Sequence, residues 1–235
     1  PGFTAMMNAA ARKLDLRDTH FNTPNGWMDD GETYSSAADL AALSTALITR
    51  HPALYRRFYG RDRLAFRGIE QPNHNPLYGY TAGADGVKTG FTNEAGYGLV
   101  GTAIREGRRL MMVVGGYDRP KDRAAQARAL MEWGFAGWEA HPLFAQGVRI
   151  GQAQVQGGAV RAVDLVAPMP IALTLPRGVR ARYSIAIRYK GPLKAPIAKG
   201  EPVASLVVRA EGQAEERVAL VAAQAVPKGG LLARI

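Results

Sequence analysis

The region between residues 84 and 114 constrains the fold most, because it holds several strand patterns joined by short turns. Residues 84–92 and 96–104 have the pattern of extended segments, and glycines are spaced along the second one. A short turn that contains Gly107 then leads into another apolar run at 110–114. Two apolar runs separated by a glycine-containing turn are typical of an antiparallel hairpin. We therefore predict antiparallel β-structure within the first part of the chain.

The first of these segments carries a cation, a hydroxyl and a glycine in succession, at Lys88, Thr89 and Gly90. Successive side chains of a strand point to opposite faces, so Lys88 and Gly90 are expected on one face and Thr89 and Phe91 on the other. A glycine in a strand lets another backbone approach closely. This pattern predicts the wall of a carboxylate-binding cleft, with Lys88, Thr89, Gly90 and Phe91 as candidate substrate-binding residues. An ordinary edge strand is the alternative interpretation.

Several further blocks occur in a fixed order around this strand. They are Phe-Asn-Thr-Pro-Asn-Gly at 21–26, Tyr-Ser-Ser-Ala-Ala-Asp-Leu at 34–40, Gln-Pro-Asn-His-Asn at 71–75 and Asp-Gly-Val-Lys-Thr-Gly at 85–90. In order and spacing the chain resembles the serine D-alanyl-D-alanine carboxypeptidases, which are low-molecular-weight penicillin-binding proteins of the peptidase S11 type. The similarity covers essentially the whole chain, and it is specific because many blocks agree.

The resemblance implies a fold of two parts. Residues 1–138 would be the C-terminal portion of an α+β penicillin-binding, β-lactamase-like catalytic domain. Residues 139–235 would form a small, β-rich domain that resembles an all-β sandwich. The sequence itself changes in the same sense, because apolar residues at helical spacing give way after residue 143 to short apolar runs separated by Gly and Pro.

The resemblance also implies three catalytic motifs, Ser-x-x-Lys, Ser-x-Asn and Lys-Thr-Gly, of which only the last is present. No serine has a lysine three places later or an asparagine two places later; the serines are Ser35, Ser36, Ser44, Ser184 and Ser205. In the family both missing motifs lie upstream of the part that this chain matches. We therefore expect a fragment that lacks its nucleophile and is inactive alone.

For the full-length protein the resemblance implies removal of the terminal D-alanine from peptidoglycan stem peptides through an acyl-enzyme. Lys88 would attract the substrate carboxylate, Thr89 would donate its hydroxyl to it, and the backbone N–H of Phe91 would serve as one oxyanion donor. β-Lactam antibiotics would bind in the same place, and no metal or cofactor is implied. The location would be periplasmic, held at the inner membrane by a C-terminal anchor that is absent from this chain.

Other functions stay open at this point. A serine β-lactamase shares the catalytic fold, although the additional β domain argues against it. A non-catalytic relative that binds the cell wall is also compatible with the sequence, because the region that would carry the nucleophile is not part of it. A nucleic-acid-binding module would depend on the high isoelectric point alone and is disfavoured, because the first part of the chain is nearly neutral.

The charge is concentrated in the second part. Residues 1–140 hold 17 basic and 15 acidic residues, whereas residues 141–235 hold 13 basic and 5 acidic ones, a net charge of +8. Such asymmetry suggests an anionic partner, and we expect a membrane surface. An alternative is an ordinary solvated face, since Arg180, Arg182, Arg188 and Lys190 lie along expected strands.

Local patterns complete these expectations. Phe3, Met6 and Met7 recur at helical spacing and predict a helix with a buried stripe. Ser36 should cap the next helix, and Asn73 and Asn75 should brace a loop. The absence of cysteine excludes disulfides and thiolate metal sites, and the four histidines lack the spacing of metal ligands.

Overall fold

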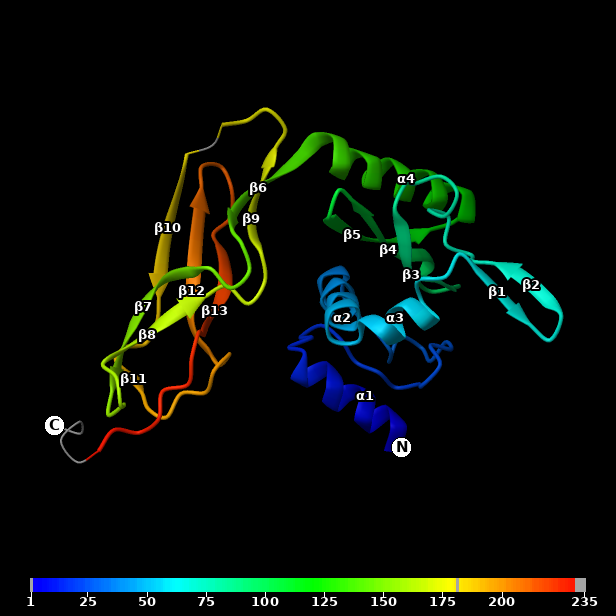
Figure 1. The fold of residues 1–235 in the computed structure, drawn as a ribbon. Coiled ribbons are helices and arrows are strands. Elements are labelled where there is room, and N and C mark those ends of the chain that lie inside the picture. Colours follow the sequence, from blue (N-terminus) through cyan, green and yellow to red (C-terminus); the bar gives the residue numbers. More distant parts are fainter. Residues whose placement is uncertain (1, 181, 231–235) are drawn as a thin grey trace. The chain divides into compact units, whose positions relative to one another are not determined.

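The structure is a computed structural model that describes residues 2–180 and 182–230. The chain divides into two compact units, Pro1–Ala136 and Gly137–Ile235. The first unit mixes helices and strands, whereas the described elements of the second are strands (Figure 1). This confirms the expected fold class, an α+β unit followed by an all-β unit. Within the described residues, no helix has both the length and the apolar character needed to cross a bilayer.

The centre of the first unit is an antiparallel sheet with the strand order β3-β4-β5. The strands are β3 (Ala84–Thr92), β4 (Gly96–Arg105) and β5 (Arg108–Tyr117). The predicted hairpin between β4 and β5 is confirmed, and its two turn residues, Glu106 and Gly107, have φ values of 50° and 78°. Positive φ at both positions is what a type I′ turn requires. Since β3 is an edge strand of this sheet, one side of its backbone is unpaired in the described strands.

Helices cover both faces of this sheet (Figure 1). Leu99 and Val100 are neighbours in β4 and point to opposite faces. Leu99 packs in one buried cluster with Met131, and Val100 packs in another with Tyr55. Met131 belongs to α4 and Tyr55 to α3, so each face has its own helical layer. The helices of the first unit are α1 (Gly2–Lys13), α2 (Ala37–Arg50), α3 (Pro52–Phe58) and α4 (Pro120–Gly137).

The start of α2 has the serine cap that the sequence predicts. The Ser36 hydroxyl accepts a hydrogen bond from the Asp39 N–H at 3.2 Å, which confirms the predicted cap. Asp39 is itself buried, and its carboxylate accepts hydrogen bonds from the Asp18 N–H at 2.8 Å and the Thr19 hydroxyl at 2.6 Å. The cap therefore also fastens the loop that precedes α2.

The sequence predicted the helix α1 correctly, but it predicted the wrong residues on the buried side of that helix. Phe3 is 62% exposed and Met6 is 68% exposed, while Ala11 is the buried residue of the helix. Helical spacing identifies a stripe but does not identify what covers it. In the described chain α1 is fixed through Asn8, whose side chain donates to the Phe21 carbonyl at 2.7 Å and accepts from the Phe21 N–H at 2.9 Å.

A short hairpin of β1 (Arg63–Phe66) and β2 (Ile69–Pro72) extends from the first unit (Figure 1).

The second unit contains a sheet with the strand order β10-β12-β13-β8-β7-β11 and a smaller sheet of β6 and β9. Its strands are β6 (Trp138–Phe144), β7 (Arg149–Gln156), β8 (Ala162–Val166), β9 (Ile171–Pro176), β10 (Tyr183–Arg188), β11 (Leu193–Lys194), β12 (Pro202–Ala210) and β13 (Glu216–Ala222).

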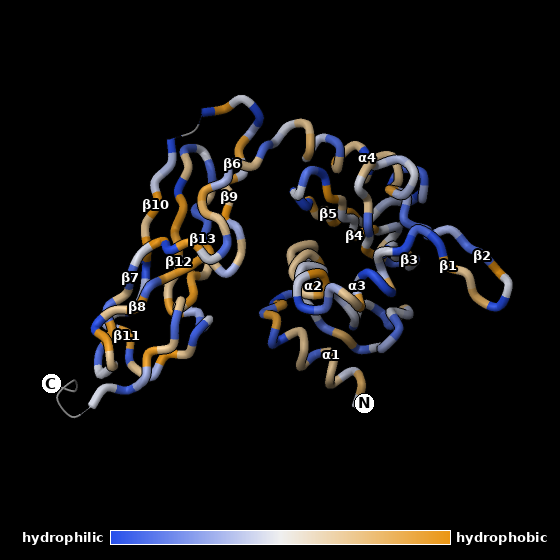
Figure 2. The backbone as a smooth tube through the Cα atoms, in the orientation of Figure 1, coloured by the Kyte–Doolittle hydropathy of each residue, from blue (hydrophilic) through white to orange (hydrophobic). Residues whose placement is uncertain are grey.

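The core of the second unit lies along its long strands, where Figure 2 shows hydrophobic residues on β12 and β13. Leu165, Leu206 and Leu220 are fully buried there. The short apolar runs expected after residue 143 correspond to β8, β9, β10, β12 and β13, and they did not include β6, β7 or β11. Pro142 lies inside β6, and β7 alternates glutamine with small residues, so neither has the composition of a typical strand.

Candidate functional site

The exposed strand β3 presents the candidate residues with the alternation that the sequence predicts. Lys88 pairs with Val100 and Gly90 with Gly98, which places both on one face. Thr89 pairs with Leu99 and Phe91 with Tyr97 on the opposite face. Lys88, Gly90 and Phe91 are exposed and Thr89 is half-buried.

The surface around Gly90 is open. A Cβ atom built on Gly90 would meet no described atom within 4 Å, and its backbone has no positive φ that would demand glycine. Neither backbone conformation nor close packing in the described structure therefore requires a glycine at this position. The Lys88 ammonium donates to the Thr89 carbonyl at 2.5 Å, so the cation lies along the strand.

Two hydrogen-bond networks fix the start of β3. The Arg109 guanidinium donates to both carboxylate oxygens of Asp85, at 2.8 and 2.7 Å, and the Thr102 hydroxyl donates to Asp85 at 2.5 Å. A bidentate pair of this kind fixes orientation as well as position. The Tyr55 hydroxyl donates to the Asp85 carbonyl at 3.0 Å, and burial raises the pKa of that phenol.

Asn75 fixes Gly86, the residue that follows Asp85 in β3. Its buried side chain donates to the Gly86 carbonyl at 2.7 Å and accepts from the Leu77 N–H at 3.0 Å, and Asn73 in turn accepts from the Asn75 N–H at 2.9 Å. This confirms the predicted role of the two asparagines as loop braces. Buried contacts that begin at Gly86, two residues before Lys88, therefore fix the position of Lys88.

Arg123 is a residue of this region that the sequence reasoning missed. It belongs to α4 and is 9% exposed, and its Nη1 donates to the Gly98 carbonyl at 3.4 Å. The guanidinium lies 5.7 Å from the centre of the Tyr97 ring, and its Nε has no hydrogen-bond partner in the described part of the chain. Burial lowers the pKa of Arg123, which marks a desolvated cation.

A signal for Arg123 was present in the sequence. Arg123, Ala127, Met131 and Phe135 recur every four residues along α4, and all are buried. A charged residue in line with an apolar stripe is unusual. Gly98, which Arg123 contacts, pairs with Gly90, so this buried charge lies beneath the strand pair that carries the candidate residues.

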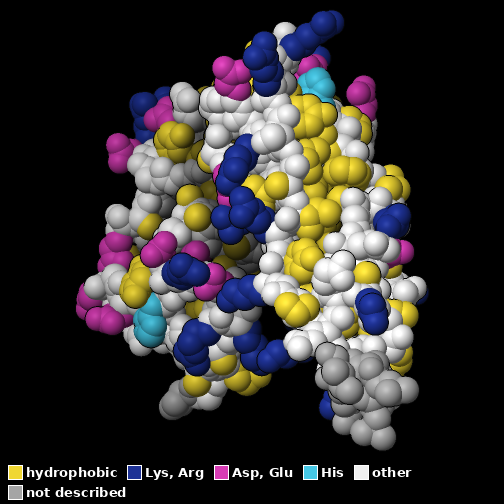
Figure 3. All heavy atoms as spheres, turned by 90° about the vertical axis from the view of Figure 1, so that its left-hand side faces the viewer, with side chains coloured by type: hydrophobic (Ala, Val, Ile, Leu, Met, Phe, Trp, Pro, Cys, Tyr) yellow, Lys and Arg dark blue, Asp and Glu magenta, His cyan; other side chains and the backbone are white. Residues whose placement is uncertain are grey.

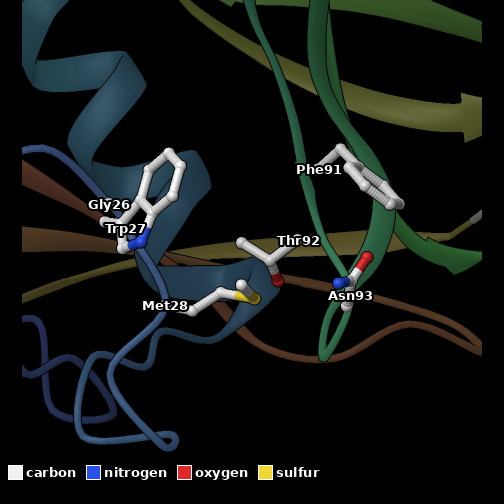
Figure 4. A pocket seen from close by; sticks show the side chains of 6 residues that line it. All are labelled: Gly26, Trp27, Met28, Phe91, Thr92 and Asn93. Atoms are coloured by element: carbon white, nitrogen blue, oxygen red, sulfur yellow. The ribbon is translucent and has the colours of Figure 1, made fainter.

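A pocket of about 230 Å³ opens at the far end of β3 (Figure 4). Phe91 and Thr92 line it from the end of β3, and Asn93 lines it from the turn that follows. Gly26, Trp27 and Met28 line it from the loop before α2.

Comparison with known proteins gives consistent matches to both units. The family model described as D-alanyl-D-alanine carboxypeptidase matches residues 1–118, and that described as penicillin-binding protein 5, C-terminal domain, matches residues 138–228. The D-alanyl-D-alanine carboxypeptidase DacD of Salmonella typhimurium is 34% identical over 240 residues, which cover 100% of this chain and 60% of the relative.

Solved structures of penicillin-binding proteins are also similar to this chain. Penicillin-binding protein 5 from Haemophilus influenzae superimposes with a TM-score of 0.74 at 33% identity, covering 97% of this chain and 67% of that one. Penicillin-binding protein D2 from Listeria monocytogenes in its cefotaxime-bound form has a TM-score of 0.52 at 36% identity, over 56% of this chain and 54% of that one. The chain spans about 60% of the length of the curated relatives that it matches.

Proposed function

This chain belongs to the D-alanyl-D-alanine carboxypeptidase family of cell-wall metabolism, and from that premise we propose the function of the whole protein. It is a serine-type hydrolase that removes the terminal D-alanine from peptidoglycan stem peptides outside the cytoplasm. The observation that carries the proposal is the Lys-Thr-Gly sequence on an exposed edge strand, beside an open Gly90 and above the buried charge of Arg123.

The proposed chemistry follows from this arrangement. Lys88 and Thr89 bind the terminal carboxylate through a charge-assisted hydrogen bond and a hydroxyl hydrogen bond. The Phe91 N–H donates to the oxygen of the penultimate carbonyl, where negative charge develops. A serine oxygen attacks that carbonyl carbon, the C–N bond breaks, and D-alanine leaves with the serine proton. Water then hydrolyses the ester and restores the serine.

The nucleophile of this scheme does not come from a Ser-x-x-Lys sequence of the chain, because the 235 residues contain none. We propose that it is contributed by residues outside them and that the chain alone forms no acyl-enzyme. β-Lactams present a carboxylate and an acyl carbonyl at a similar separation, and they would bind at the same strand.

A labelled penicillin tests this proposal. The 235-residue chain is expected to carry no label after denaturation, whereas a protein that also includes the residues encoded upstream of Pro1 should be labelled stoichiometrically. The longer protein should also release D-alanine from an N-acyl-D-Ala-D-Ala peptide.

The outcomes separate the alternatives. Labelling of the chain itself would contradict its proposed inactivity. Fast release of the label as penicilloate would indicate a β-lactamase, and a longer protein with neither labelling nor D-alanine release would indicate a non-catalytic relative.

We propose that Arg123 adds a second positive charge beneath the carboxylate site. A buried cation with an unpaired Nε costs stability, so an apolar replacement of similar length should leave the melting temperature unchanged or raise it. Arg123→Met in the whole protein is expected to lower kcat/KM for the peptide about 10- to 100-fold, the value of a charge-assisted hydrogen bond. The conservative variant Arg123→Lys should recover part of that loss. An Arg123→Met enzyme with unchanged kcat/KM would refute the assignment of Arg123 to the carboxylate site.

The basic second unit suggests contact with an anionic membrane surface, which we propose as its partner. In Figure 3, Lys and Arg side chains are visible among hydrophobic and acidic ones on the face that is turned to the viewer. Attraction near an anionic surface is worth about 1 kcal/mol per basic residue and fades within a Debye length. We therefore expect weak binding that physiological salt abolishes.

Co-sedimentation with phosphatidylglycerol vesicles checks this expectation. Changing Arg180, Arg182 and Arg188 together to Gln should weaken binding at low salt tenfold or more. The matched control changes Arg50, Arg56 and Arg57 to Gln in the first unit, which removes equal charge. Equal binding to neutral vesicles, or equal loss in both triple variants, would rule out a surface specific to the second unit.

A further inference from the structure

We propose that Asp85 and Arg109 are positioning residues, which decide the face of β3 on which Lys88 lies. Asp85 is the extra residue of a β-bulge, and its ion pair with Arg109 holds that bulge in place. The inference rests on the proposed function for the role of Lys88 in binding substrate. The bulge and its contacts are independent of that function.

The pairing of β3 with β4 changes by one residue at Asp85. Ala84 lies opposite Ala103. Gly86 lies opposite Thr102, the next residue of β4, so Asp85 has no residue opposite it in the described strands. An extra residue of this kind is a β-bulge, and it shifts the alternation of every residue that follows in the strand.

The bulge determines which face of the sheet carries Lys88. With the extra residue in place, Lys88 lies opposite Val100. If the register of Ala84 continued without an extra residue, Lys88 would lie opposite Leu99 instead, on the other face. Leu99 is 2% exposed and packs against α4. Without the bulge, Lys88 would therefore point to the packed side of the sheet, and Thr89 would exchange faces with it.

The side chain of Asp85 is held in a closed group of three. Arg109 donates to both of its carboxylate oxygens, and the Thr102 hydroxyl donates to one of them. The Arg109 Nη1 also donates to the Thr102 hydroxyl oxygen at 3.0 Å, and Thr102 is fully buried. Because a guanidinium presents a rigid fork, this pair fixes the orientation of the extra residue as well as its position.

The backbone of the bulge receives hydrogen bonds from side chains of other segments. The Tyr55 hydroxyl of α3 donates to the Asp85 carbonyl, and the Asn75 amide of the preceding loop donates to the Gly86 carbonyl. Buried carbonyls need a donor where a ladder is interrupted. Helix, loop and two neighbouring strands thus converge on one extra residue. Bulges next to active sites re-aim side chains, which is the role we assign to this one.

The effect of the ion pair should be seen in substrate binding. In Arg109→Met the Asp85 carboxylate loses its fork, the extra residue can shift along β3, and fewer molecules hold Lys88 opposite Val100. Substrate binds only those molecules, so the apparent KM rises by the inverse of their fraction while kcat changes little. Hydrogen bonds to charged groups correspond to about 10- to 100-fold in an equilibrium, so KM should rise about tenfold or more.

The test combines kinetics with a direct measurement of the pairing. For the protein that includes the upstream residues, kcat and KM are measured with an N-acyl-D-Ala-D-Ala peptide. For the 235-residue chain, cross-strand nuclear Overhauser contacts report the register of β3. We expect Arg109→Met to raise KM about tenfold or more with kcat within about threefold. The contact of Lys88 with Val100 should weaken, and a contact with Leu99 should appear.

Three further variants make the test specific. Arg109→Lys keeps the charge without the fork and should recover part of the KM. Asp85→Asn combined with Arg109→Met should be no worse than Arg109→Met alone, because both changes break the same pair. The matched control is Arg63→Met, which removes an exposed ion pair with Glu70 in the β1–β2 hairpin and should leave KM unchanged. If Arg109→Met does not fold, Arg109→Lys provides the comparison with a smaller rise in KM.

The outcomes separate positioning from stability and from the reaction. A folded Arg109→Met protein with unchanged KM, or with an unchanged contact between Lys88 and Val100, would overturn the inference. A fall in kcat at constant KM would also overturn it, because a destabilised protein loses active molecules without changing the KM of the rest. A wild-type longer protein that releases no D-alanine would refute the proposed function instead. A changed pairing in Arg109→Met would still support the role of the ion pair in β3.

Discussion

Lys88→Ala in the whole protein is expected to lower kcat/KM for an N-acyl-D-Ala-D-Ala peptide by about 30-fold to several thousand-fold. This range corresponds to the roughly 2–5 kcal/mol lost when one partner of a desolvated charge pair is truncated. The variant should fold normally, because Lys88 is exposed and its ammonium donates to the Thr89 carbonyl of its own strand.

Acylation by penicillin should fall together with hydrolysis of the peptide, since both ligands present a carboxylate to the same strand. Lys121→Ala provides the matched control, because Lys121 is an exposed cation of α4 in the same unit. Both rates are measured alongside the melting temperature. An unchanged kcat/KM in a folded Lys88→Ala protein would refute the assignment of the carboxylate site to β3.

Gly86→Ala should destabilise the first unit by about 3 kcal/mol. A Cβ atom at this position would lie 2.0 Å from the Tyr55 hydroxyl oxygen, and Gly86 has a φ of 155°. Overpacking a filled site costs about 1–3 kcal/mol, and a backbone conformation that alanine avoids costs about 1–3 kcal/mol more. The loss is a large fraction of the stability of a typical domain.

Gly90→Ala separates stability from binding in the same strand. It adds the same methyl group in open space at an ordinary φ, so the free energy of unfolding should change by no more than about 0.5 kcal/mol. The added methyl group nevertheless occupies the space in which the terminal residue of the substrate would lie, so affinity should fall. Denaturant unfolding and peptide binding are measured for both variants. Equal unfolding free energies for the two variants would contradict the close packing of Gly86 against the Tyr55 hydroxyl.

Several features were predictable because they depend on residues close together in the chain. The β4–β5 turn needed only Glu106 and Gly107, and the α2 cap needed only Ser36 and Asp39. The alternation along β3 followed from the period of a strand. Where composition was ambiguous, as in β6 with Pro142, the prediction failed.

Burial was less predictable than secondary structure. The Met6 stripe of α1 has the spacing of a core-facing helix, yet Met6 is mostly exposed in the described structure. Arg123 shows the reverse case, a charged residue that lies in the buried stripe of α4. Spacing tells which residues share a face, whereas the packing partner of that face comes from other parts of the chain.

The sequence by itself determined the family of this protein, the strand that carries Lys88 and its neighbours, and the absence of a Ser-x-x-Lys motif, because each is a property of residue order. The tertiary structure alone decided that Arg123 lies beneath this strand and that Trp27 faces Phe91 across a pocket. Trp27 is 64 residues from Phe91 in the chain. Contacts over such separations depend on how whole layers pack, and local spacing does not encode them.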